Sequence, residues 1–310
     1  MRGADRGAVE LCLRVALVCA AITLLAGGAA AADYFSPQLL VDVEWLEAHG
    51  ARPGVRIIDF RETREEYEDG HIPGAAFVDR TRVTAAVGGV PMMLAHAETV
   101  VDVIREAGVD NISTVVAYDD VGGLWASRLF WVLEHLGHED VRLLDGGWAA
   151  WNEEVREIST VEPYHGEGDF TACIRSDRLA TRDWILAHLD DPCVLFLDVR
   201  TPGEYVGEDA RADRGGHIPG AVSIDWVEAL TDDGSRRVLK ADELIDIYEE
   251  SGVTPEREIV TYCQGGVRAA HTYFVLRLMG YPWVRVYDAS WVEWGNDPDV
   301  PIEGPEPSSE

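Results

Sequence analysis

The sequence predicts an α/β protein made of two homologous domains, each a mainly parallel sheet flanked by helices. Three observations lead to this prediction. The chain has 310 residues, enough for two compact domains of ordinary size. Several segments recur in the same order after about 140 residues, a separation that fits a duplicated domain. Each copy alternates short β-branched runs with longer helical stretches, as in parallel sheets buried between helices.

The duplication is visible in four pairs of segments. One pair ends a strand with Asp-x-Arg, and another has the sequence Gly-His-Ile-Pro-Gly-Ala in both copies. The remaining two pairs are a β-branched run and a segment that ends in tryptophan. The paired ranges are 57–61 with 196–200, 70–75 with 216–221, 114–119 with 258–263, and 141–148 with 284–291.

Residues 1–32 predict an export signal. Three arginines precede a twelve-residue apolar core, Val15–Ala26, and small residues ending in Ala30-Ala31-Ala32 follow it. This core is shorter than the roughly 20 residues that span a bilayer. We therefore expect cleavage, a periplasmic or secreted protein, and no stable membrane association afterwards. An uncleaved membrane anchor is the alternative.

The rest of the chain divides at a polar segment rich in proline and glycine. We expect an N-terminal domain at 37–154, a linker at 155–168, a C-terminal domain at 169–298 and an acidic, frayed tail at 299–310.

Each domain should contain a central strand, then a glycine-containing turn and an apolar helix. The expected strands include Val115–Val116 and Ile259–Val260, and the expected helices are Leu124–Leu136 and Val267–Met279. Gly137 and Gly280 should end these helices in the left-handed conformation.

The composition is strongly acidic. With 56 acidic and 26 basic residues, the chain carries a net charge of −30, which excludes nucleic acid as a favoured partner. A solvated acidic face explains this charge, and adaptation to high salt is a sharper alternative.

Removal of the leader leaves three cysteines, so at least one is unpaired. Cys173 and Cys193 lie in apolar contexts, and we expect small buried side chains there, with a disulfide as the alternative. Cys263 differs because it stands where a strand ends and a helix begins.

The segment Cys263–Arg268 (Cys-Gln-Gly-Gly-Val-Arg) has the composition of an anion-binding loop. Backbone N–H groups of a tight loop and of the first helical turn point at one spot and favour negative charge there. Gly265 and Gly266 permit the close turn. We expect the Cys263 thiol to be reachable, to have a lowered pKa and to act as a nucleophilic thiolate, with Arg268 adding positive charge.

The first copy has Asp119 at the position of Cys263, and its loop contains no arginine. We therefore predict that the N-terminal domain is non-catalytic and shields the substrate.

These motifs resemble those of the two-domain (tandem) rhodanese, or thiosulfate sulfurtransferase, family over nearly all of residues 37–297. The resemblance rests on both Asp-x-Arg strand ends, both Gly-His-Ile-Pro-Gly-Ala segments, the Cys263–Arg268 loop and residues 287–291. It implies an inactive N-terminal domain and an Arg200 that reaches the substrate anion. Many family members have lysine or arginine at the second or third loop position and threonine at the sixth, where this chain has Gln264, Gly265 and Arg268.

The resemblance implies a double displacement. Cys263 takes the outer sulfur of thiosulfate, sulfite leaves, and the cysteine persulfide passes its sulfur to cyanide or a thiol. Arg200 would hold the sulfite end together with Arg268. Backbone amides would stabilise the anionic sulfur at Gln264, Gly265, Gly266, Val267 and Arg268. The reaction needs no cofactor, and the cysteine and histidine spacing offers no zinc site.

Residues that recur in both copies should have structural roles, because one copy lacks the nucleophile. This argument predicts that the two histidines stabilise turns and that the carboxylates accept backbone hydrogen bonds. The two tryptophans either line the cleft or belong to the core. These pairs are His71 and His217, Asp59 and Asp198, Glu66 and Glu204, and Trp148 and Trp291. For His271 we expect packing rather than tuning of the thiolate.

Two other functions remain open, and a third is disfavoured. A mercaptopyruvate sulfurtransferase would use the same nucleophile with a keto-acid donor. A non-catalytic persulfide carrier would load sulfur without turnover. A cysteine phosphatase is disfavoured, because its loop has one more residue between cysteine and arginine than the loop here.

Overall fold

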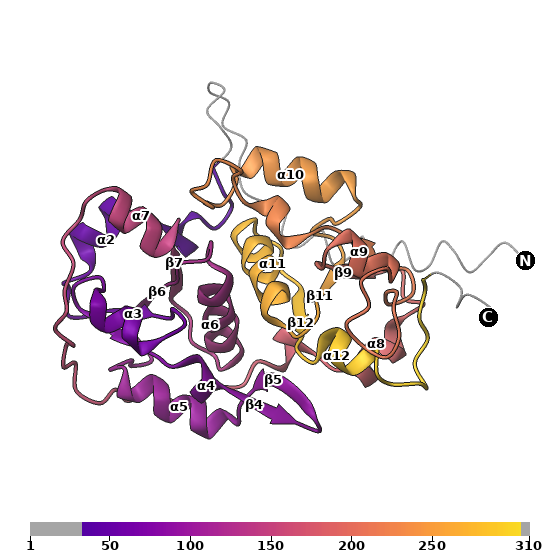
Figure 1. The fold of residues 1–310 in the computed structure, drawn as a ribbon, viewed down its shortest axis with the longest axis horizontal. Helices are drawn as coiled ribbons and strands as arrows, with labels where there is room; N and C mark the ends of the chain where they lie inside the picture. The colour runs from indigo at the N-terminus through magenta and orange to yellow at the C-terminus, as the bar shows by residue number, and fades with distance from the viewer. Residues whose placement is uncertain (1–32, 305–310) are drawn as a thin grey trace, which may run out of the picture.

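The computed structural model describes residues 33–304, and it has two α/β domains that pack side by side (Figure 1). Each domain contains a five-stranded sheet in which every pairing is parallel, with the orders β1-β7-β6-β2-β3 and β10-β9-β11-β12-β8. The predicted fold class is confirmed. The proposed export signal lies outside the described residues. Between residues 33 and 304, no helix has the length and apolar character needed to cross a membrane.

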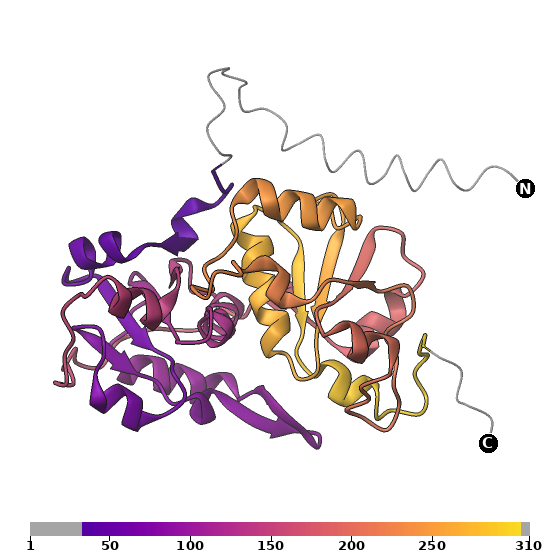
Figure 2. The same cartoon turned by 45° about the horizontal axis from the view of Figure 1, so that its top comes forward.

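The N-terminal domain also carries an antiparallel hairpin, β4–β5, that extends toward the other domain (Figures 1 and 2). Its strands are β1 Leu40–Val41, β2 Val55–Asp59, β3 Ala75–Phe77, β4 Thr84–Val87, β5 Val90–Leu94, β6 Thr114–Tyr118 and β7 Val141–Leu144. Its helices are η1 Pro37–Leu39, α2 Val43–His49, α3 Arg64–Asp69, α4 Arg80–Val83, α5 Ala97–Glu106, α6 Leu124–His135 and α7 Gly147–Glu153.

The C-terminal domain repeats the sheet without the hairpin. Its strands are β8 Leu179–Ala180, β9 Val194–Asp198, β10 Val222–Ser223, β11 Glu258–Tyr262 and β12 Val284–Tyr287. Its helices are η2 Ser176–Arg178, α8 Arg182–His188, α9 Pro202–Val206, η3 Trp226–Ala229, α10 Ala241–Glu250, α11 Val267–Leu278 and α12 Ser290–Trp294.

The strands β6 and β11, which lead to the loops that begin at Asp119 and Cys263, are buried, as their β-branched sequences predict. Val115, Val116, Ile259 and Val260 are fully buried in β6 and β11. Strands covered on both faces lose the polar alternation of a surface strand, and both sheets show this property. β6 and β11 are each the central strand of their sheet, so the loops that follow them lie at corresponding places in the two domains.

Helices α6 and α11 follow these loops and pack against each other at the domain interface (Figure 1). Phe130 of α6 meets Phe274 of α11 edge to face, with ring centroids 5.1 Å apart. As expected, Gly137 and Gly280 follow the helices with φ of 89° and 85°. One hydrophobic core thus runs through both domains.

The chain leaves the N-terminal domain later than the composition suggested. Phe170 is buried, and the backbone N–H of Cys173 donates to the Leu136 carbonyl at 2.8 Å. The start of the expected frayed tail is also packed, since Val300 is 4% exposed and Glu303 pairs with His217 through two backbone hydrogen bonds. Main-chain pairing orders both segments despite their polar sequences.

The expectation that Cys173 and Cys193 are buried is wrong. Cys173 is an exposed free thiol, and Cys193 is half-buried in the turn before β9. Both positions are fixed through the main chain, because Cys173 N–H donates to Leu136 and Cys193 N–H donates to the Asp191 carboxylate at 2.9 Å. Their apolar neighbours therefore did not require a buried side chain.

Candidate active site

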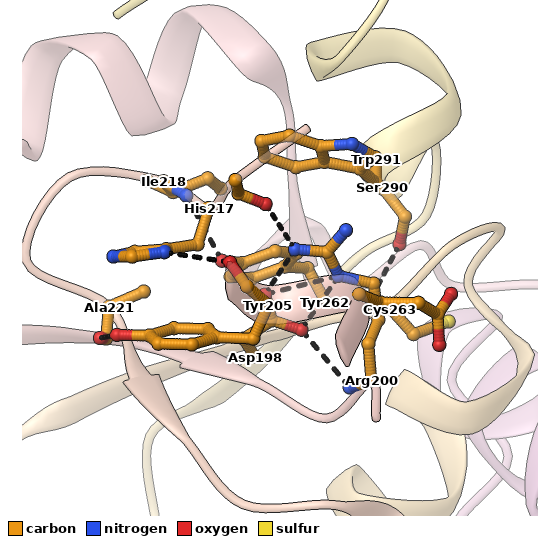
Figure 3. A network of polar contacts seen from close by, with 12 residues as sticks. Asp198, Arg200, Tyr205, His217, Ile218, Ala221, Tyr262, Cys263, Ser290 and Trp291 are labelled. Atoms are coloured by element: carbon orange, nitrogen blue, oxygen red, sulfur yellow. Dashed lines mark hydrogen bonds and ion pairs between the residues drawn. The ribbon is translucent and has the colours of Figure 1, made fainter. Parts of the chain in front are cut away.

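Cys263 lies at the carboxyl end of β11, and the loop after it is held by the segment that follows β12 (Figure 3). The Cys263 N–H donates to Ser290 Oγ at 3.1 Å, and its carbonyl accepts from Trp291 N–H at 3.0 Å. Gly266 then precedes α11 with φ of 81°, a left-handed conformation that favours glycine. The backbone around the cysteine is therefore fixed on both sides.

The loop presents unused backbone donors. Within residues 33–304, we find no acceptor for the backbone N–H groups from Gln264 through Ala269. The first four N–H groups of a helix always lack an intrahelical acceptor, and here the loop adds further donors beside them. These N–H groups are available to an anion at the Cys263 side chain.

The N-terminal domain shows what such donors do when an anion is present. The Asp119 carboxylate accepts four backbone hydrogen bonds, at 2.7–2.9 Å. Two donors belong to the loop and two to the first turn of α6, and they are Val121, Gly123, Trp125 and Ala126. A negatively charged side chain at the strand end thus satisfies the loop and the helix terminus together.

Cys263 is less accessible than the sequence suggested. It is 2% exposed and belongs to the hydrophobic core that spans both domains, so the side chain expected to be reachable is covered in this structure. The cause is tertiary, because Cys263 belongs to the core that both domains share, and Ser290 and Trp291 of the segment after β12 bind its backbone.

Arg268 makes a bidentate ion pair with Glu204 of α9, with distances of 2.6 and 2.9 Å. Burial opposes both charges, but the hydrogen bonds between them prevail. They lower the pKa of Glu204 to about 2 and raise the pKa of Arg268. Sequence reasoning grouped Glu204 with Glu66, whose carboxylate, within residues 33–304, accepts hydrogen bonds from Thr63 alone.

Arg200 is buried inside the C-terminal domain. Its guanidinium donates to Asp198 at 2.6 Å and to the Gly216 carbonyl at 2.7 Å, and it stacks over Trp291 (Figure 3). The N-terminal domain contains the same arrangement, with Asp59, the Gly70 carbonyl and Trp148 around Arg61. The matching partners indicate a structural role that both domains share, and the implied contact between Arg200 and the substrate anion stays a prediction.

The paired histidines have the expected structural role. The His71 and His217 rings stack on Tyr67 and Tyr205, with centroids 3.8 and 3.7 Å apart. Each Nδ1 lies within hydrogen-bond distance of the carbonyl of the tyrosine it covers.

His271 is also buried, and it meets Trp226 edge to face. Burial lowers the pKa of this histidine to about 4, which keeps it neutral, in agreement with the expected packing role.

The second copy contains an insertion beside the Cys263 loop that the sequence analysis did not identify. Four positions separate Tyr67 from His71, whereas twelve separate Tyr205 from His217. The additional residues lie against the cysteine loop, because Gln264 Nε2 donates to the Arg211 carbonyl at 2.9 Å. Arg211 points a half-exposed side chain toward Glu204, 3.4 Å away. The length difference between the copies was the available sequence signal.

The described residues contain no group of three or more histidine, cysteine, aspartate or glutamate side chains arranged to hold a metal ion. The site as built is therefore a thiol, a set of backbone donors and the Arg268–Glu204 pair. Such a site can stabilise an anionic sulfur and support nucleophilic chemistry at Cys263.

Known proteins match both halves of the chain. A model of the rhodanese-like domain matches residues 42–154 and again 181–297. The thiosulfate sulfurtransferase of Azotobacter vinelandii is 36% identical over 271 residues, which cover 87% of this chain and 99% of that protein. The sulfur carrier protein TtuD of Thermus thermophilus is 38% identical over 282 residues, which cover 87% and 98%.

Solved structures agree with these matches. The 3-mercaptopyruvate sulfurtransferase SseA from Escherichia coli superposes with a TM-score of 0.74 at 30% identity, covering 82% of this chain and 98% of that one. A variant of EanB in complex with ergothioneine superposes with a TM-score of 0.78 at 26% identity, covering 88% and 71%. Because both domains are matched, and nearly the whole length of the sequence relatives, the chain belongs to the rhodanese family of sulfurtransferases.

Proposed function

We propose that the chain is a thiosulfate sulfurtransferase whose nucleophile is Cys263. One observation carries this proposal: Cys263 occupies the strand-end position at which Asp119 accepts four backbone hydrogen bonds in the other domain. A thiolate or persulfide at that position would meet equivalent donors. The names of the relatives from A. vinelandii and other bacteria support thiosulfate as the donor.

In the proposed first step, the Cys263 thiolate attacks the outer sulfur of thiosulfate. A bond forms between Sγ and that sulfur, the S–S bond of thiosulfate breaks, and sulfite leaves with the bonding electron pair. In the second step, cyanide or a thiolate attacks the outer sulfur of the persulfide and releases the Cys263 thiolate. No electrons are gained from or lost to a third reactant.

We assign the stabilisation of both anionic forms to the backbone amides from Gln264 to Arg268. These donors are fixed in place before the reaction, so they need no reorganisation when charge develops on sulfur. The Arg268 side chain is paired with Glu204 and therefore supplies less net charge than a free arginine. Arg200 binds Asp198 and the Gly216 carbonyl through Nε and Nη2. Within residues 33–304 its Nη1 makes no hydrogen bond, so this is the atom that would be left for the substrate anion.

A mercaptopyruvate donor is the second candidate, and the Arg268–Glu204 pair favours it. A loop whose arginine is neutralised attracts a dianion weakly, so a donor with a single carboxylate is a reasonable alternative. The superposition on SseA supports the same possibility. Steady-state rates with the two donors decide between them, and a strong preference for mercaptopyruvate would replace the thiosulfate assignment.

The first test is thiocyanate formation from thiosulfate and cyanide. Cys263→Ser should lower turnover at least about a thousandfold, because loss of a nucleophile removes the covalent path. Cys173→Ser is the matched control, since Cys173 is a free and exposed thiol, and it should keep wild-type turnover. Stoichiometric sulfur loading of wild type without turnover would instead identify a persulfide carrier.

A further inference from the structure

The carboxylate of Asp288 directly follows β12, and the N-terminal domain holds both of its oxygens. Oδ1 forms an ion pair with Arg128 Nη1 of α6 at 2.5 Å, and Oδ2 accepts from the Leu94 N–H of β5 at 2.7 Å. The Arg128 and Asp288 side chains are 0% and 2% exposed. Burying a charge costs free energy, so removing one partner of this pair leaves the other charge uncompensated and destabilises the structure around it.

Arg128 also contacts two residues of its own domain. The guanidinium lies over Trp131, 4.6 Å from the ring centroid, and donates to the Met92 carbonyl at 3.2 Å. Met92 belongs to hairpin β4–β5, which extends beneath α6 toward β12 and α12 (Figure 1). Helix α6 and hairpin β4–β5 together therefore bind the Asp288 carboxylate of the C-terminal domain.

This ion pair lies directly against the cysteine loop. A side chain at Gly266 would place its Cβ 2.7 Å from Asp288 Oδ1 and 2.9 Å from Arg128 Nη1. Gly266 precedes α11, and its position determines where the loop and first-turn N–H groups point. A shift of the ion pair would therefore be transmitted to those donors without any intervening side chain.

A second path leads from Asp288 to Cys263 through the main chain. Two residues after Asp288, Ser290 has a φ of 51°, an uncommon conformation for a residue with a side chain. Its hydroxyl donates to the Tyr287 carbonyl at 2.7 Å and accepts from the Cys263 N–H at 3.1 Å. The conformation of this short segment thus fixes the backbone of the nucleophile.

We propose that Arg128 and Asp288 are positioning residues, through which the non-catalytic domain sets the geometry of the sulfur-carrying loop. The inference rests on the proposed role of Cys263. It gives the N-terminal domain a part in catalysis beyond shielding, although none of its side chains needs to touch the substrate. Rigid placement of donors within a fraction of an ångström is what such a loop requires.

Two readouts test the proposal on the full chain in a Cys173→Ser background. The first is the burst of sulfite released from thiosulfate by stoichiometric enzyme. The second is the pH dependence of iodoacetamide alkylation at Cys263, followed by mass spectrometry of its peptide, which requires no sulfur donor. Arg268 and Glu204, the charged pair beside the cysteine loop, stay unchanged in every variant.

Arg128→Lys and Asp288→Asn should each slow the burst about tenfold or more, because small misplacements of reacting groups have effects of this size. Alkylation should also require a higher pH. The control is Arg277→Lys, which weakens another ion pair between α11 and α6, that of Arg277 with Glu134 at 3.2 Å. It should lower thermal stability but leave both readouts within about twofold of wild type.

Folded Arg128→Lys and Asp288→Asn variants with a wild-type burst and alkylation profile would overturn the proposal. So would an equal effect of Arg277→Lys, since the pair would then act only by joining the domains. If the single variants do not fold, Arg128→Met combined with Asp288→Asn removes both charges and leaves an acceptor for Leu94. Wild type that alkylates normally but releases no sulfite contradicts the proposed donor instead.

Discussion

The loop after β6 and the loop after β11 occupy equivalent places in the two domains. We call the first loop filled, because its backbone donors bind a carboxylate, and the second open, because its donors have no acceptor within residues 33–304. In the N-terminal domain, the Asp119 carboxylate accepts four backbone N–H groups and completes the loop internally. In the C-terminal domain, a cysteine stands at that position beside donors with no acceptor in the described part of the chain. In the proposed function, donors of the kind that bind the Asp119 carboxylate in one copy would stabilise an anionic sulfur in the other.

The comparison extends to the arginines. Arg61 and Arg200 have matching partners in both domains, and we assign them to the scaffold. The Arg268–Glu204 pair exists only beside the cysteine, because the first loop contains no arginine. Features that differ between the copies are therefore better guides to the chemistry than features they share.

The strongest way to challenge this comparison is to make the open loop resemble the filled one. Cys263→Asp should abolish sulfur transfer, with a loss of at least about a thousandfold. Its carboxylate should also occupy the free donors and make this variant about 1–2 kcal/mol more stable than Cys263→Ser. Thermal and urea unfolding of the two variants measure the difference. Equal stability would mean that the loop after β11 does not aim its donors at the side chain.

The reverse change empties the filled loop. Asp119→Ala leaves four backbone N–H groups without their acceptor and should destabilise the protein by about 4 kcal/mol. Unfolding in urea, followed by circular dichroism, measures this loss. Because Asp119 is not part of the proposed chemistry, turnover per folded molecule should change less than that of Cys263→Ser. An Asp119→Ala variant as stable as wild type would show that these hydrogen bonds do not matter for folding.

The smallest expected effect concerns the carboxylate present in both copies. Glu204→Gln should destabilise the C-terminal domain by about 3 kcal/mol, because it leaves Arg268 without its buried partner. Glu66→Gln is the matched control and should change stability by less than about 1 kcal/mol, since the Glu66 carboxylate accepts hydrogen bonds from Thr63 alone among the described residues.

The pKa of Glu204 gives this prediction a pH dependence. The pKa is lowered from 4.5 to about 2 in the folded protein, so the stabilising effect is complete above pH 4.5 and disappears as the pH falls toward 2. The free energies of unfolding of wild type and Glu204→Gln should therefore converge over this range. A difference that stays constant down to pH 2 would contradict the assigned ion pair.

Local sequence patterns predicted much of the architecture. The β-branched runs became β6 and β11, the apolar stretches became α6 and α11, and glycines followed both helices as expected. The histidine pairs were interpreted correctly, because recurrence in a domain without the nucleophile points to structure. The expectations for exposure were less successful, since Cys263 is covered and Cys173 is not.

By itself, the sequence determined the duplication, the strand–loop–helix unit and the presence of a cysteine at its turn, because these depend on neighbouring residues and backbone geometry. Only the tertiary structure decided which side chains meet. Glu204 and Arg268 are 64 positions apart, and Leu94 and Asp288 are 194 apart. Contacts at such separations arise when packed domains bring distant segments together, and no local periodicity encodes them.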